Sequence, residues 1–200
     1  MPKRQLCGAF VTLVLVASAP AAQALTLGTR FAPLFSDERL QGCSLDFETT
    51  QPDHANLGGA LSLAVGSFTV WALPDRAPVL MFKLGVSGPG AYNRPTPPHG
   101  VALQRDLATN AGDRISAEHL DPGYLSTIFA FSDATIASFF GGVAAGKIEA
   151  IYTSNEGGIA VPFSVDLRIA ELNLTTGQVT QGQADKEFDA CMDVLLAPTS

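Results

Sequence analysis

The chain has 200 residues, of which 46% are hydrophobic, and a formal net charge of −7 at neutral pH. This length and apolar content correspond to one domain with a hydrophobic core. The excess of acidic residues and the lack of a Lys/Arg cluster argue against a nucleic-acid partner and against an anionic membrane surface.

The N-terminus has the pattern of a secretory signal peptide. Lys3 and Arg4 precede an apolar run, and Ala22 and Ala24 occupy the −3 and −1 positions of a signal-peptidase site. A proline interrupts the run, which is shorter than the roughly 20 residues that span a membrane. The sequence predicts a Sec-type signal peptide at residues 1–24 and a bacterial periplasmic or extracellular location. The mature chain is expected to have no integral membrane segment. Its charge would be −9 rather than −7, since two cations and no acid leave.

Export determines how the cysteines are interpreted. Cys7 lies in the signal peptide, so Cys43 and Cys191 would remain and are expected to form one disulfide in an oxidising compartment. Asp189 and Asp193 flank Cys191 and disfavour a thiolate nucleophile there. Neither a CxxC nor a CxxH spacing is present, which argues against a metal site at these cysteines.

The folded part is expected to begin with a lead-in at residues 25–42, followed by a single β-rich domain at residues 43–197. In "CSLDFET", Leu45 and Phe47 alternate with Asp46 and Glu48, which is typical of a half-buried strand with the acids on its solvated face. Paired acids in this pattern indicate a wet strand face rather than a catalytic pair.

A β-hairpin is predicted from residues 60–72 and 77–86, with "LPDR" between them as the turn. The apolar residues on one face of its first strand are Leu61, Leu63, Val65 and Trp71. Ser67 follows Gly66 inside this strand rather than on a strand-to-helix turn, so it is interpreted as a packing residue and not as a hydrolase nucleophile.

Residues 87–100, "SGPGAYNRPTPPHG", predict a long surface loop. Tyr92, Arg94 and His99 lie in it and form a possible binding loop, because aromatic and arginine side chains are frequent at interfaces. Loop disorder is the favoured interpretation of this composition, and a binding loop is the alternative.

The second half predicts strands at 101–107 and 124–131 and a helix that Ser132 caps and Gly146 ends. Its apolar stripe contains Ile136, Phe139, Phe140 and Val143. A hairpin follows, in which residues 159–169 alternate without a break and Pro162 indicates a sheet edge. The last helix carries a stripe of Phe188, Cys191 and Leu195, with Asp185, Glu187, Asp189 and Asp193 expected off that stripe.

Three histidines are weak metal candidates. His54, His99 and His119 all lie in expected loops, and loops at one end of a sandwich can converge on zinc. No two of them share the spacing that places ligands on one element. Three unrelated surface histidines are therefore expected, and no metal or other cofactor is assigned.

The run "GGVAAGKIEAIYTSNEGGIAVPFSVDL", with "FDACMDVLL" after it, resembles small exported proteobacterial proteins and is distantly similar to the invasion-associated locus B family. The resemblance covers residues 60–170. It implies a β-rich envelope protein and carries over no catalytic residues.

Together these patterns predict a mainly β, or α+β, fold: an antiparallel β-sandwich or barrel-like sheet with two short helices. The expected function is a non-catalytic binding or envelope-associated protein whose partner is a protein, a glycan or another envelope component. The alternatives are a periplasmic hydrolase that uses loop histidines and acids, and a carrier of a small apolar ligand.

Overall fold

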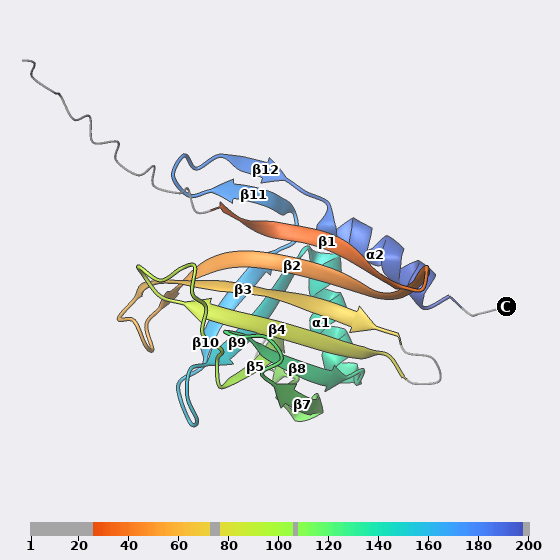
Figure 1. Cartoon of the computed structure of the whole chain (residues 1–200), viewed down its shortest axis with the longest axis horizontal. Helices are drawn as coiled ribbons and strands as arrows, with labels where there is room; N and C mark the ends of the chain where they lie inside the picture. The colour runs from red at the N-terminus through yellow and green to blue at the C-terminus, as the bar shows by residue number, and fades with distance from the viewer. Residues whose placement is uncertain (1–25, 73–76, 106–107, 198–200) are drawn as a thin grey trace, which may run out of the picture.

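The computed structural model describes residues 26–72, 77–105 and 108–197 (Figure 1). The predicted signal peptide and the turn at 73–76 lie outside this range. The strands of the larger sheet are β1 (Thr26–Ser36), β2 (Arg39–Asp53), β3 (Ala60–Trp71), β4 (Val79–Ser87), β7 (Arg114–Glu118), β8 (Leu125–Ala130), β11 (Ile169–Asn173) and β12 (Val179–Gln181). Those of the smaller sheet are β5 (Gly100–Arg105), β6 (Ala108–Thr109), β9 (Lys147–Thr153) and β10 (Val161–Asp166). The helices are η1 (Ala111–Asp113), α1 (Asp133–Ala145) and α2 (Ala184–Leu195).

The described strands form two antiparallel sheets. The larger has the order β12-β11-β1-β2-β3-β4-β8-β7, and the smaller has the order β10-β9-β5-β6. In Figure 1 the smaller sheet and α1 lie behind the larger sheet, with the strands of the two sheets crossing. The predicted fold class is confirmed: the described residues form a mainly β, sandwich-like architecture with two α-helices. Among the described residues, no helix combines the length and the apolar character needed to cross a bilayer.

The expectation of a lead-in at residues 25–42 is wrong, because this segment forms β1 and the start of β2. β1 pairs with β2 on one side and with β11 on the other, so it lies inside the larger sheet. Leu27 and Thr29 are buried and alternate with Gly28 and exposed Arg30. A threonine, a glycine and a proline interrupt the alternation of apolar and polar residues in this segment, so the period-two pattern that predicts a strand is weak there.

The hairpin of β3 and β4 is confirmed, but the face of β3 that packs into the core is the one opposite Leu61, Leu63, Val65 and Trp71. Leu63 is nevertheless buried, with 2% exposure, outside the core cluster. Ala64, Phe68 and Val70 face the interior and have 0% exposure. Gly66 and Ser67 interrupt the apolar residues of this strand, so the sequence pattern does not identify its buried face. Packing against the smaller sheet decides which face is buried.

The core between the sheets is built from phenylalanine rings. Phe47 of β2 stacks on Phe68 of β3 with ring centroids 4.9 Å apart, and Phe68 lies 4.5 Å from Phe82 of β4. Phe163 of β10 reaches Phe47 from the smaller sheet at 6.1 Å. These contacts bury about 150–250 Å² for each aromatic side chain and dominate the energetics of such a core.

The smaller sheet presents one edge, β10, to the inner face of the larger sheet. Pro162 lies on this edge strand as predicted. Thr49 donates a hydrogen bond to the carbonyl oxygen of Ser164 at 3.1 Å, and Thr29 donates to that of Asp166 at 2.9 Å. Threonine hydroxyls thus donate hydrogen bonds to carbonyl oxygens of this edge strand.

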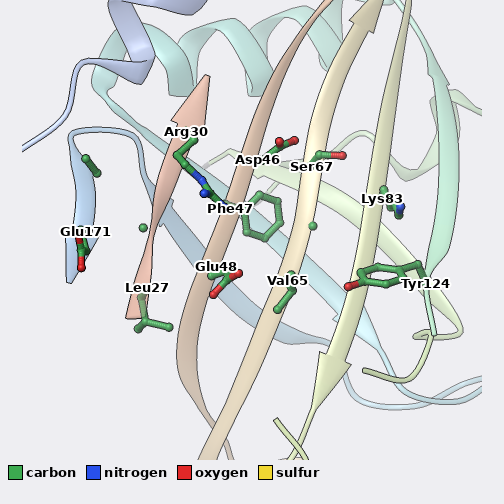
Figure 2. Close-up of a pocket in the computed structure, with 13 residues that line it drawn as sticks. Leu27, Arg30, Asp46, Phe47, Glu48, Val65, Ser67, Lys83, Tyr124 and Glu171 are labelled. Atoms are coloured by element: carbon green, nitrogen blue, oxygen red, sulfur yellow. The ribbon is translucent and has the colours of Figure 1, made fainter. Parts of the chain in front are cut away.

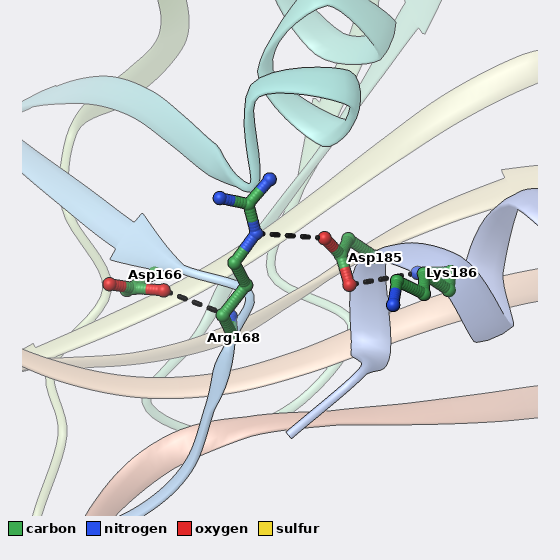
Figure 3. Close-up of polar contacts among 4 residues, drawn as sticks. All are labelled: Asp166, Arg168, Asp185 and Lys186. Carbon is green, nitrogen blue, oxygen red and sulfur yellow. Dashed lines mark hydrogen bonds and ion pairs between the residues drawn. The ribbon is translucent and has the colours of Figure 1, made fainter. Parts of the chain in front are cut away.

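The alternating run at 159–169 is not one strand. β10 ends at Asp166, and after Leu167 and Arg168 the chain enters β11 of the other sheet. Figure 3 shows how Arg168 anchors this crossing: its backbone N–H donates to Asp166 at 2.9 Å and its Nε to Asp185 of α2 at 3.1 Å. Asp185 is therefore buried, contrary to the expectation that all four acids lie off the packed stripe.

α1 begins and ends where the sequence predicts. The Ser132 hydroxyl accepts from the Thr135 N–H at 3.1 Å, and Gly146 closes α1 with a φ of 75°. Phe139 and Val143 are buried, whereas Ile136 is 41% exposed.

The predicted disulfide joins Cys43 of β2 to Cys191 of α2, with their Cα atoms 6.1 Å apart. The pairing is thus confirmed, and it fastens the last helix to the inner face of the larger sheet.

Removing the disulfide is expected to lower stability strongly. The two cysteines are 148 residues apart, and the chain-entropy model assigns about 5 kcal/mol, as an upper value, to a loop of that length. The double variant Cys43→Ala/Cys191→Ala should lose a large part of this free energy of unfolding in a urea titration. Wild-type protein with reductant is the control and should unfold near the same midpoint as the variant. A shift of less than about 1 kcal/mol would show that the bond adds little to the packing of α2.

Gly66 is expected to tolerate no side chain. A Cβ there would lie 2.0 Å from the carbonyl oxygen of Lys83 and 3.0 Å from Cζ of Phe47, its cross-strand partner. Gly66→Ala should therefore destabilise the fold by about 1–3 kcal/mol, the usual cost of overpacking. Gly112→Ala is the matched control, since its Cβ would meet nothing within 4 Å. Equal melting temperatures for the two variants would contradict this expectation.

Candidate functional site

The outer face of the larger sheet contains a groove with a volume of about 510 Å³ (Figure 2). Its lining comes from β1, β2, β3 and β4, with Tyr124 just before β8 at one end and Ala170 and Glu171 of β11 at the other. We call this feature the outer groove.

One row of polar side chains crosses the outer groove in register. Arg30 of β1 is the direct cross-strand partner of Asp46, Asp46 of Ser67, and Ser67 of Lys83. Direct partners in antiparallel strands project to the same face with Cβ atoms about 4.5–5.5 Å apart. These four residues, the polar row, therefore line one side of the groove together, as Figure 2 shows.

A second row explains why the face is hollow. Glu48 pairs with Gly28 on one side and with Val65 on the other, and Val65 pairs with Gly85. Two of these four positions carry no side chain. We call the four residues the glycine row.

The two glycines also let other segments rise as walls. A Cβ on Gly28 would lie 2.2 Å from the carbonyl oxygen of Ala170, so β11 leans over the sheet there. A Cβ on Gly85 would lie 2.8 Å from the Gly123 carbonyl oxygen and 2.9 Å from the Tyr124 ring. Close backbone approach of this kind needs glycine. Walls therefore stand at both ends of the glycine row, with Glu48 and Val65 on the floor between them.

The charges in the outer groove have both signs. Lys83 forms an ion pair with Asp121, and its Nζ lies 4.7 Å from the centroid of the Tyr124 ring. Asp46 accepts a hydrogen bond from the Ser44 hydroxyl at 3.0 Å. Neither Arg30 nor Glu48 has an ion pair with any residue in the described part of the chain. The groove thus offers charged donors and acceptors to a ligand.

The predicted binding loop lies elsewhere. It connects β4 to β5, and Tyr92 is half-buried with its carbonyl accepting from the Ser87 hydroxyl at 3.3 Å. Arg94 and His99 are exposed. None of Tyr92, Arg94 and His99 lines the outer groove.

All three histidines lie in loops, as expected: His54 lies between β2 and β3, His99 before β5, and His119 after β7. The His119 Nδ1 is 3.3 Å from the carbonyl oxygen of Tyr124. Among the described residues, no three His, Cys, Asp or Glu side chains are arranged to hold a metal ion. The structure does not bring the three imidazoles together as a metal site.

A buried polar network joins the two sheets beside a second, smaller hollow of about 170 Å³. The Tyr152 hydroxyl of β9 donates to Asp53 of β2 at 2.9 Å, and the Asn56 side chain donates to the same carboxylate oxygen at 2.9 Å. Gln51 donates to Ser62 at 2.7 Å, and Ser62 lies 3.3 Å from the Tyr152 hydroxyl. Asp53 and Tyr152 are only 2% and 1% exposed.

Hydrogen bonding decides the charge state of this pair. Burial raises the pKa of Asp53, but hydrogen bonds from Asn56 and Tyr152 outweigh burial, so its pKa lies below the ordinary 3.8. Burial and the bond to Asp53 raise the pKa of Tyr152 to about 12. Asp53 is thus ionised and Tyr152 protonated at neutral pH, and both carboxylate oxygens already accept hydrogen bonds. We assign this network to structure rather than to ligand binding.

Sequence reasoning missed the outer groove for identifiable reasons. The sequence pattern assigns Arg30 to a lead-in, Ser67 to packing, and Asp46 and Glu48 to a solvated strand face. The acids are indeed on the solvent side, with Asp46 exposed and Glu48 half-buried. The available signal was the alternation of Ser44, Asp46 and Glu48 with apolar residues in β2, but cross-strand register is needed to see which residues of the neighbouring strands align with them.

Comparisons of the chain with protein-family models, with curated proteins and with solved structures give no match. The resemblance to the invasion-associated locus B family stays a prediction.

The Asp53 network is expected to make stability pH-dependent. Because the folded pKa of Asp53 is lowered, its contribution is fully present above the unfolded value near 3.8 and is lost as pH falls through the folded value. Asp53→Asn should lower the free energy of unfolding by about 1–3 kcal/mol at pH 7. The difference from wild type should shrink below pH 3.8.

Chemical denaturation at neutral and acidic pH measures this effect. Glu156→Gln in the exposed β9–β10 loop is the control and should match wild type at both values. A difference between Asp53→Asn and wild type that does not change with pH would show that the lost charge is not its cause.

Proposed function

We propose that this chain is an exported bacterial binding protein, without catalytic activity, that holds an envelope component in the outer groove. The observation that carries the proposal is the groove itself: charged and polar side chains from four strands converge with a tyrosine on one concave face. Ligand sites commonly are such concavities of about 300–1,000 Å³ with a few convergent polar groups. The signal-peptide pattern at residues 1–24 and the disulfide support export, since disulfides form in oxidising compartments.

The chemistry of the groove favours binding over turnover. The periplasmic hydrolase alternative relied on His54, His99 and His119, and none of these lines the groove. The apolar-carrier alternative needed an open interior, whereas phenylalanine rings in mutual contact occupy the space between the sheets.

The proposal concerns a partner outside the cytoplasm. A protein, a glycan or another envelope component is the class of partner that export makes available. The resemblance to the invasion-associated locus B family, an exported β-rich envelope protein family, points in the same direction.

Filling the groove tests the proposal. Val65 is half-buried on the groove floor with its side chain on the outer face, so Val65→Trp should block the groove without entering the core. Purified mature protein should co-sediment with isolated bacterial envelope fragments, and Val65→Trp should reduce the bound fraction by about tenfold, which corresponds to about 1.4 kcal/mol.

Val194→Trp is the matched control, because Val194 is 66% exposed on α2. Its binding should equal that of wild type, and circular dichroism should show that both variants fold. Undiminished sedimentation of Val65→Trp would remove the groove as the binding site.

A further inference from the structure

We propose that the ligand of the outer groove is a neutral, hydroxyl-rich oligosaccharide segment that lies across β1 to β4. This inference rests on the proposed function and specifies the ligand of the same groove.

The mixed charge of the groove carries the inference. Arg30 and Lys83 are its cations, and Asp46, Glu48 and Glu171 are its acids. A ligand with one sign of charge would meet like charges within a few ångströms, which is unfavourable. A sugar hydroxyl both donates and accepts hydrogen bonds. A polyhydroxyl ligand can therefore pair with the carboxylates and with the arginine in one pose.

The spacing of the polar row fits an extended ligand. Its four residues lie on four neighbouring strands, β1 to β4, and the strands are about 4.8 Å apart. The row from Arg30 to Lys83 therefore spans about 14 Å, three inter-strand steps. A chain of a few sugar rings would present hydroxyls repeatedly along that length.

Val65 of the glycine row and Tyr124 beside it supply the apolar part of the same site. Val65 is half-buried on the floor, and Figure 2 shows the Tyr124 ring at the wall with its hydroxyl toward Val65. Pyranose rings have apolar C–H faces that pack on aliphatic and aromatic side chains, and the Tyr124 hydroxyl remains available for a hydrogen bond. Hydroxyl contacts on one side and ring contacts on the other give a sugar chain a defined orientation.

Calorimetric titration with neutral oligosaccharides tests the inference. The probes are N-acetylglucosamine oligomers and cello-oligosaccharides, each from monosaccharide to hexasaccharide. Affinity should rise with length and level off once the polar row is covered. Binding should change less than about twofold between about 0.05 and about 0.5 M NaCl, because it does not depend on ionic attraction.

Variants of the polar row test the named contacts. Asp46→Asn and Arg30→Ala should each weaken binding by about tenfold, the effect of losing one hydrogen bond to a charged group. Both side chains are exposed on the outer face, so the fold should be retained. Glu187→Gln, at an exposed position of α2, is the charge-matched control for Asp46→Asn and should bind like wild type.

Three outcomes would overturn the inference in distinguishable ways. Salt-sensitive binding of an oligolysine or oligoaspartate peptide, lost in Asp46→Asn or Arg30→Ala, would identify a charged ligand and keep the groove as a site. Failure of all oligosaccharides, with envelope co-sedimentation still lost in Val65→Trp, would reject the sugar and keep the proposed function. Failure of all oligosaccharides together with failure of envelope co-sedimentation would reject both the sugar ligand and the proposed function.

Discussion

The burial of one face of β2, β3 and β4 is the constraint on which the rest of this structure depends. Phe47, Phe68 and Phe82 point inward and contact one another across three neighbouring strands. Because side chains alternate with a period of two, a slip by one residue would turn these rings to solvent, so the core sets the register. The same register places Asp46, Ser67 and Lys83 side by side on the other face. Core packing thus positions the groove residues, and Phe47 itself contributes to the lining of the groove.

Glycine gives this polar surface its shape. At Gly28 and Gly85 the backbone of another segment occupies the space of a side chain, and each segment forms a wall. Gly66, on the opposite face, lets the Phe47 ring and the Lys83 carbonyl approach β3. Three positions without side chains therefore act on both faces of one sheet. Substitutions at Gly28 or Gly85 would change the walls of the groove and substitutions at Gly66 would change the core, whereas changes at Val65 or Asp46 are confined to the groove.

The remaining contacts hold the second layer in place. Thr29 and Thr49 satisfy the edge carbonyls of β10, Arg168 links the crossing between the sheets to α2, and the Cys43–Cys191 bond fastens α2 to β2. The Tyr152–Asp53 hydrogen bond joins the sheets near the other end of β2. A rigid sheet follows from these attachments, and a binding surface on its outer face inherits that rigidity.

Local patterns in the sequence were enough for the elements whose signals are local. Ser132 and Gly146 delimit α1, the alternation of Leu45 and Phe47 marks β2, and two cysteines outside the signal-peptide pattern indicate one disulfide. The sequence alone did not reveal that residues 26–36 form an internal strand, that the run at 159–169 divides between two sheets, or that Arg30, Asp46, Ser67 and Lys83 form one row. Those features depend on which strands pair and in what register. Pairing is determined by the burial of residues far apart in the chain, and so only the tertiary structure decided them.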